Sequence, residues 1–83
     1  MMLTKLKEIN NKVIGTKQTI KALKNQRVLQ LFVANDAEQK VTNPIIDLAH
    51  KNRVTIIYVN SMNELGIAAN IEVGAAVVAV LKS

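Results

Sequence analysis

Three stretches of the chain are almost wholly apolar, and each is typical of a β-strand. They cover Val28–Ala34, Val54–Val59 and Val73–Leu81. Valine and isoleucine, which favour strands because their branched side chains pack well on a pleated surface, are frequent in them. A strand without regular polar positions is buried on both faces. We therefore expect these strands to lie in a sheet that is covered by helices on both sides.

The first part of the chain has apolar residues at helical spacing. A short amphipathic helix over residues 3–11 is predicted by Leu3, Leu6 and Ile9. A brief apolar step, Val13-Ile14, follows and ends at Gly15. We expect Thr16 to cap a second helix that runs to about Gln26, because a threonine hydroxyl can accept a hydrogen bond from a free amide of the first turn.

Two further helices are predicted between the strands. Asn43 followed by Pro44 is typical of an N-cap with proline at the first helical position, and it predicts a helix that runs to about Asn52. The core stripe of this helix would consist of Ile45, Leu48 and Ala49. Ser61 and Glu64 form a capping box that predicts a short helix to about Ala69. Asn70 can adopt the left-handed conformation that ends it.

The alternation of helices and strands sets the fold class. The 83 residues are enough for one small domain, which we expect to span residues 1–83. Buried strands alternating with helices predict the α/β class, as a three-layer α/β/α sandwich around a small mixed or parallel sheet. The segment from Val28 to Val59 is expected to form a right-handed strand–helix–strand unit.

The positive charge of the chain is confined to its first third. The formal net charge is +5, but residues 1–27 alone carry a balance of +6 and residues 28–83 a balance of −1. A segregated basic segment favours an anionic partner, most simply a nucleic acid. The alternative is a solvated lysine-rich face that only aids solubility.

Groups that could support catalysis or metal binding are few. The chain has no cysteine. Its one histidine, His50, lies near the predicted C-terminus of a helix, where a histidine side chain interacts favourably with the helix dipole. Asp36 and Glu38 are a possible carboxylate pair, but a solvated turn explains them better. We expect no enzymatic activity, no cofactor and no metal.

The chain also carries no pattern that would direct it to a membrane. Lysines near its start argue against an export signal, and the longest apolar run, Val73–Leu81, is too short to cross a bilayer. We therefore expect a cytoplasmic protein.

The start of the second predicted helix is the first candidate site. Its free amides and the helix dipole attract anions. Lysine and glutamine side chains there suit phosphates and guanine edges. The candidate residues are Gly15, Thr16, Lys17, Gln18, Lys21 and Lys24. Lysines at this spacing share one helix face, so an ordinary amphipathic helix is the competing interpretation.

The second candidate site is the segment Ile71, Glu72 and Val73, which follows the end of a helix. Its apolar side chains could be tucked into the core, or they could cover an extruded base, because RNA is often recognised through unstacked nucleotides. The two aromatic residues, Phe32 and Tyr58, lie in predicted strands, which argues against a single-strand binder that stacks bases on aromatic rings. A folded RNA fits better.

Three short segments at characteristic separations resemble the kink-turn RNA-binding family of ribosomal protein L7Ae, and in particular its short bacterial members. They are residues 15–22 (GTKQTIKA), 65–70 (LGIAAN) and 71–76 (IEVGAA), and the resemblance extends from about Val13 to Leu81. It implies a mixed four-stranded sheet in the α/β/α sandwich. It also implies recognition of RNA duplexes that bend at a three-nucleotide bulge next to sheared G·A pairs.

The resemblance assigns roles to the two candidate sites. Lys17, Gln18 and Lys21 would contact the guanines and nearby phosphates, while residues 71–73 would cover bulged nucleotides. The resemblance also implies that the two segments lie side by side. Archaeal and eukaryotic members have Asn-Glu where this chain has Lys17-Gln18, and lysine cannot accept a hydrogen bond, so the guanine contacts must differ.

The expected partner is a structured RNA containing a kink-turn, in ribosomal RNA, an mRNA leader or a riboswitch, with no DNA specificity and no membrane contact. We expect a monomer, and association with the ribosome as a ribonucleoprotein component is among its expected roles. The alternative function is a protein-interaction or regulatory module, because one fold serves many functions. The basic first third argues against that alternative.

Overall fold

The computed structural model describes residues 11–82. The helix predicted over residues 3–11 therefore lies outside the described residues, except for its last position. The described elements are β1 (Lys12–Ile14), α2 (Thr16–Lys24), β2 (Val28–Ala34), α3 (Gln39–Lys51), β3 (Thr55–Val59), α4 (Met62–Ala68) and β4 (Val77–Leu81). The predicted order of helices and strands is confirmed, and the apolar step at Val13-Ile14 is an edge strand.

The four strands form one mixed sheet in the order β1-β4-β2-β3. The last strand, β4, lies between β1 and β2 and is antiparallel to both, whereas β2 and β3 run parallel. In the register, Val78 lies opposite Ile14 on one side and Phe32 on the other. The parallel pair is the expected product of the crossover through α3.

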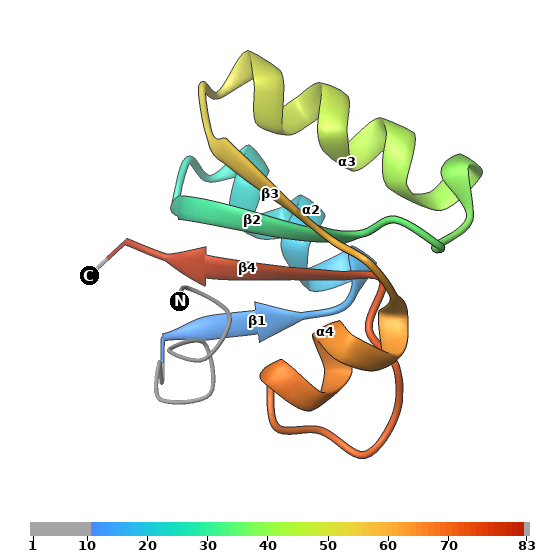
Figure 1. The fold of residues 1–83 in the computed structure, drawn as a ribbon. Coiled ribbons are helices and arrows are strands. Elements are labelled where there is room, and N and C mark those ends of the chain that lie inside the picture. The colour runs from blue at the N-terminus through green and yellow to red at the C-terminus, as the bar shows by residue number, and fades with distance from the viewer. Residues whose placement is uncertain (1–10, 83) are drawn as a thin grey trace.

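Helices cover both faces of the sheet (Figure 1). On one face, α2 and α3 pack over a core that includes Leu23, Leu31 and Ile45. On the other face, α4 packs over a second core that includes Phe32 and Leu65. Successive residues of a strand point to opposite faces, so the apolar strands supply both cores at once. The three-layer α/β/α sandwich predicted from the sequence is confirmed.

The strand β3 differs from the prediction that all apolar strands are buried on both faces. It lies at the edge of the sheet, and its residues Ile56 and Ile57 are only half-buried. Tyr58 is 53% exposed. The apolar composition of a strand does not indicate whether it lies in the centre or at the edge of a sheet. The prediction therefore could not show that β3 has a neighbouring strand on one side only.

The prediction for α3 was wrong at its start. The helix begins at Gln39, with Glu38 as the N-cap, and Pro44 lies inside it. Proline removes one helical hydrogen bond, but the preceding turn is held by the buried Thr42, whose hydroxyl donates to the Glu38 carbonyl at 3.4 Å. The predicted core stripe is correct: Ile45 and Ala49 are fully buried, and the half-buried Leu48 packs against the same core.

The prediction for β4 was also wrong at its start. The strand begins at Val77, and Val73, the expected first residue, is 72% exposed. The amide of Ala75 donates to the Met62 carbonyl of α4 at 3.0 Å, so the chain is bound to that helix before it enters the sheet. Apolar residues that precede a strand in sequence cannot be told from the strand itself by composition.

The three described helices end in the same way. In each, the residue after the C-cap has a left-handed backbone: Gln26 (φ 56°), Arg53 (φ 56°) and Asn70 (φ 65°). The amide of the next residue bonds back to the helix, as when Arg27 donates to the Ala22 carbonyl at 3.0 Å. These are Schellman motifs in which a residue other than glycine takes the left-handed position. The predicted role of Asn70 is confirmed, and Ser61 accepts from the Glu64 amide at 3.0 Å, as its capping box requires.

Candidate nucleic-acid interface

Gly15 connects β1 to α2 in a backbone conformation that favours glycine, with φ 100° and ψ 164°. It is the N-cap of α2, and no side chain caps this helix end, so the expected capping role of Thr16 is wrong. Thr16 is instead the first helical residue. The Gly15 carbonyl accepts from the Thr19 amide at 3.2 Å, which leaves the preceding amides of the first turn available to a ligand.

The side chains of α2 divide between core and solvent as the sequence predicts. Thr19, Ala22 and Leu23 are buried. The exposed residues of this helix include Lys17, Gln18, Lys21 and Lys24. Gln18 and Lys21 line a groove on the β1 side of the helix, whereas Lys24 lines a groove toward α3 together with Asp47. The helix therefore presents an amide and two lysines near its start, and the third lysine, Lys24, faces a different groove.

The loop between α4 and β4 is held firmly against α4. The Schellman end of the helix gives the first attachment, where the Ile71 amide donates to the Gly66 carbonyl at 3.0 Å. The loop also packs closely against α4 at Gly66. A Cβ atom at this position would collide with the carbonyl oxygen of Val73 and approach the Gly74 Cα to 3.1 Å. Sequence analysis missed this role of Gly66. A glycine inside a short helix was the only signal for it.

The loop residues have different environments. Ile71 is half-buried and packs against the core beneath α4, so the core interpretation applies to it. Glu72 is exposed, and Val73 is among the most exposed large apolar side chains of the described residues. An apolar side chain that is held in water by a rigid backbone is a candidate contact surface.

Hydrogen bonds across the sheet bring the helix start and the loop together. The Gly15 amide donates to the Val77 carbonyl at 3.1 Å, and the Ala34 amide donates to the Ala76 carbonyl at 2.9 Å. The residue that opens α2 is therefore bonded to the residue at which the loop enters β4. Gly15 and Val77 lie 62 residues apart in the sequence, and their adjacency follows from the position of β4 between β1 and β2.

Asp36 and Glu38, the possible carboxylate pair, each lie at the start of a different helix. Asp36 accepts a hydrogen bond from the Met62 amide at 2.7 Å, which fixes the start of α4, and Glu38 is the N-cap of α3. Asp36 thus helps to position the helix that carries the loop. Residues 11–82 include no cluster of three metal-ligating side chains, and none of their helices is long and apolar enough to cross a membrane.

The fold and this surface define a small basic α/β/α domain in which a helix that begins after a glycine lies near a loop bonded to α4. The chain belongs to the ribosomal protein L7Ae/L30e/S12e/Gadd45 family, whose model matches residues 2–83. The likeness to that family expected from the sequence is confirmed.

Several relatives carry names that state a binding function. An RNA-binding protein from Halalkalibacterium halodurans is 46% identical over 99% of this chain and 100% of its own length. The RNA-binding protein YbxF from Geobacillus stearothermophilus is 44% identical over 84% of this chain and 85% of its own. The fold is shared with a 15.5 kD RNA binding protein from Giardia lamblia, with a TM-score of 0.87, 18% identity, and coverage of 99% and 69% of the two chains.

Gly66→Ala should displace the loop. The added methyl group collides with backbone rather than with a flexible side chain, so we expect a loss of about 1–3 kcal/mol in the free energy of unfolding. Amide NMR signals of residues 71–74 should shift as well. Chemical denaturation measures the first effect, and Asn63→Ala, at an exposed position of the same helix, is the control. Unchanged stability together with unchanged loop signals would show that the loop does not depend on Gly66.

Proposed function

We propose that the protein binds kink-turn RNA through the start of α2 and the loop of residues 71–73. The observation that supports this most directly is the hydrogen bond from the Gly15 amide to the Val77 carbonyl, because it puts the start of α2 next to the residue at which the chain enters β4 from the loop. A kink-turn presents paired guanines beside unpaired nucleotides. A binding surface for it therefore needs polar groups for base edges next to an apolar cover.

The start of α2 supplies the polar groups. Its uncapped amides carry the positive end of the helix dipole, which favours phosphate oxygens. Lys17 and Lys21 donate to phosphates or to the acceptors on the major-groove edge of guanine. Gln18 both donates and accepts, so it can also pair with a base amino group. Gly15 and Thr16 shape the approach of the backbone.

The loop supplies the apolar cover. The exposed Val73 side chain would lie against a bulged base, with Gly66 fixing the height of the loop above α4. The Glu72 carboxylate accepts hydrogen bonds only, so it would pair with base amino groups or a ribose hydroxyl rather than with phosphate. Ile71 would act from beneath, by anchoring the loop to the core.

The cellular role that fits this surface is non-enzymatic. We propose a cytoplasmic protein that acts as a monomer on structured RNA, associated with ribosomes or with an mRNA element. The name of the family and the names of the relatives support an RNA partner. Binding through phosphates makes the affinity depend on salt, which gives the proposal a measurable signature.

Lys21→Gln should weaken binding to a kink-turn duplex several-fold. It removes one phosphate contact, so the slope of log affinity against log salt should become shallower by about 0.7–0.9. Lys40→Gln removes the same charge from an exposed position at the start of α3 and should change neither quantity. Fluorescence anisotropy over a salt series measures both. If the two variants behave alike, Lys21 acts only through the net charge, and the site at the start of α2 is wrong.

Val73→Asp should lower kink-turn affinity at least tenfold without lowering the melting temperature, because the side chain is exposed and the new carboxylate would repel RNA. Ile71→Asp provides the contrast, since this half-buried residue should lose stability as well. The comparison combines an RNA titration with thermal unfolding. A Val73→Asp protein that binds as tightly as wild type would exclude the loop from the interface.

A further inference from the structure

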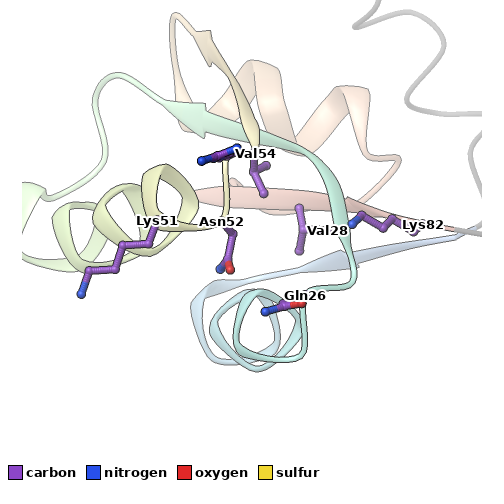
Figure 2. A pocket seen from close by; sticks show the side chains of 7 residues that line it. Gln26, Val28, Lys51, Asn52, Val54 and Lys82 are labelled. Atoms are coloured by element: carbon purple, nitrogen blue, oxygen red, sulfur yellow. The ribbon is translucent and has the colours of Figure 1, made fainter.

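A second basic surface lies at the end of the sheet opposite the α2 start. It is a pocket of about 220 Å³ where α2 and α3 end, β2 begins and β4 ends (Figure 2). The pocket is lined by Gln26, Val28, Lys51, Asn52, Arg53, Val54 and Lys82. The strand β2 runs from this pocket to the loop end of the sheet, and its seven residues at about 3.3 Å each separate the two surfaces by roughly 20 Å.

The pocket combines three cations with an apolar floor. Lys51, Arg53 and Lys82 line it, and no acidic residue does. Val28, at 3% exposure, and the half-buried Val54 form the apolar part. These residues come from three separate segments of the chain. The fold therefore brings Lys82 and Val28 to the same pocket as the end of α3.

Asn52 gives the pocket a fixed polar group. Its side-chain nitrogen donates to the Leu23 carbonyl at 2.9 Å and to the Leu48 carbonyl at 3.1 Å, which ties the end of α3 to α2. These two hydrogen bonds fix the side-chain amide group and occupy both of its N–H donors. Its oxygen remains as an acceptor, which suits a ribose hydroxyl rather than a phosphate.

Two residues of the pocket hold a backbone conformation that favours glycine. Gln26 and Arg53 both have φ 56°, a left-handed geometry that is unfavourable for a residue with a Cβ atom. The backbone does not need these particular side chains, because the amides that follow, of Arg27 and Val54, already bond to the Ala22 and Ala49 carbonyls. All three described helices end with this geometry, so what is particular to Gln26 and Arg53 is that their side chains line the pocket.

Stabilisation of the helix ends does not account for the pocket. A cation in the last turn of a helix interacts favourably with the helix dipole, and this explains Lys51. It does not explain Lys82, which follows β4, nor the choice of arginine over glycine at position 53. Three cations around an apolar and amide-lined cavity match the alternating phosphate and ribose of an RNA backbone.

We infer that this pocket is a second RNA contact, which binds a phosphate and its ribose from an RNA segment other than the one at the α2 start. Because the surfaces lie at opposite ends of the sheet, the protein would bridge two segments of a folded RNA. This inference rests on the RNA binding proposed above, and not on kink-turn recognition.

The test is a titration of the whole protein with a 12-base-pair RNA duplex, before and after saturation with an unlabelled kink-turn RNA. We expect the duplex to bind in both cases and to shift the NMR signals of Gln26, Arg53 and the Asn52 side-chain amide. Shifts confined to the α2 start, or no binding to the saturated protein, would overturn the inference. The duplex is also titrated into the protein without kink-turn RNA. Binding at the pocket can therefore be judged even if the protein does not recognise a kink-turn.

Arg53→Gly separates function from structure at the same position. Glycine relieves the left-handed strain, so the melting temperature should stay at or above the wild-type value. Duplex affinity for the pocket should fall about three- to tenfold, and the salt slope should become shallower by about 0.7–0.9. Arg53→Lys, which keeps the charge, should restore most of the binding, and Lys40→Gln is the charge control.

Three outcomes would contradict the inference. A lower melting temperature for Arg53→Gly, with RNA affinity unchanged, would make Arg53 a structural residue. Equal losses of affinity in Arg53→Gly and Lys40→Gln would reduce the effect to net charge. Shifts of the pocket signals with inorganic phosphate but not with the RNA duplex would make the pocket a site for a small anion only.

Discussion

The structure depends on the insertion of β4 between β1 and β2. This strand is last in the sequence, yet it is one of the two central strands of the sheet. Its residues Val77 to Val80 are almost fully buried, and their side chains belong alternately to the two cores. Its first carbonyl, at Val77, accepts the Gly15 amide. One strand therefore closes the core and joins the start of α2 to the loop after α4.

Opposite ends of this sheet carry different chemistry. At one end, an uncapped helix start meets a loop whose height is set by Gly66. At the other end, two helices terminate in left-handed residues that carry side chains instead of glycine. Glycine would be more stable at Gln26 and Arg53. Because α4 ends in the same geometry at Asn70, the feature that distinguishes the pocket end of the sheet is its basic lining.

Much of the fold could be predicted because its elements have strong local signals. Apolar runs identified the buried strands, the helix of residues 62–68 was predicted from its Ser61 cap, and Asn70 marked the end of that helix. The signals failed where tertiary contacts decide the outcome. Pro44 suggested a helix start, but packing around Thr42 and Ile45 extends α3 back to Gln39. Val73 resembled a strand residue because periodicity cannot detect the bond from Ala75 to α4.

The candidate sites show the same division. The exposed lysines of α2 follow from helical spacing alone, but the closeness of the loop to Gly15 does not. It requires the strand order, which joins positions more than 50 residues apart. The basic pocket could not be predicted from the sequence for the same reason. Lys51, Arg53 and Lys82 lie in the part of the chain with a net charge of −1, and the fold brings Lys82 to the same pocket as the other two.

The most direct test of the account is a titration of the wild-type protein with a kink-turn duplex and a matched control. In the control duplex the sheared G·A pairs are replaced by Watson–Crick pairs, which keeps the length and the charge. The account predicts a preference for the kink-turn of at least tenfold that persists as salt is raised, because shape recognition adds to the phosphate contacts. Equal binding to the two duplexes, falling in parallel with salt, would contradict it.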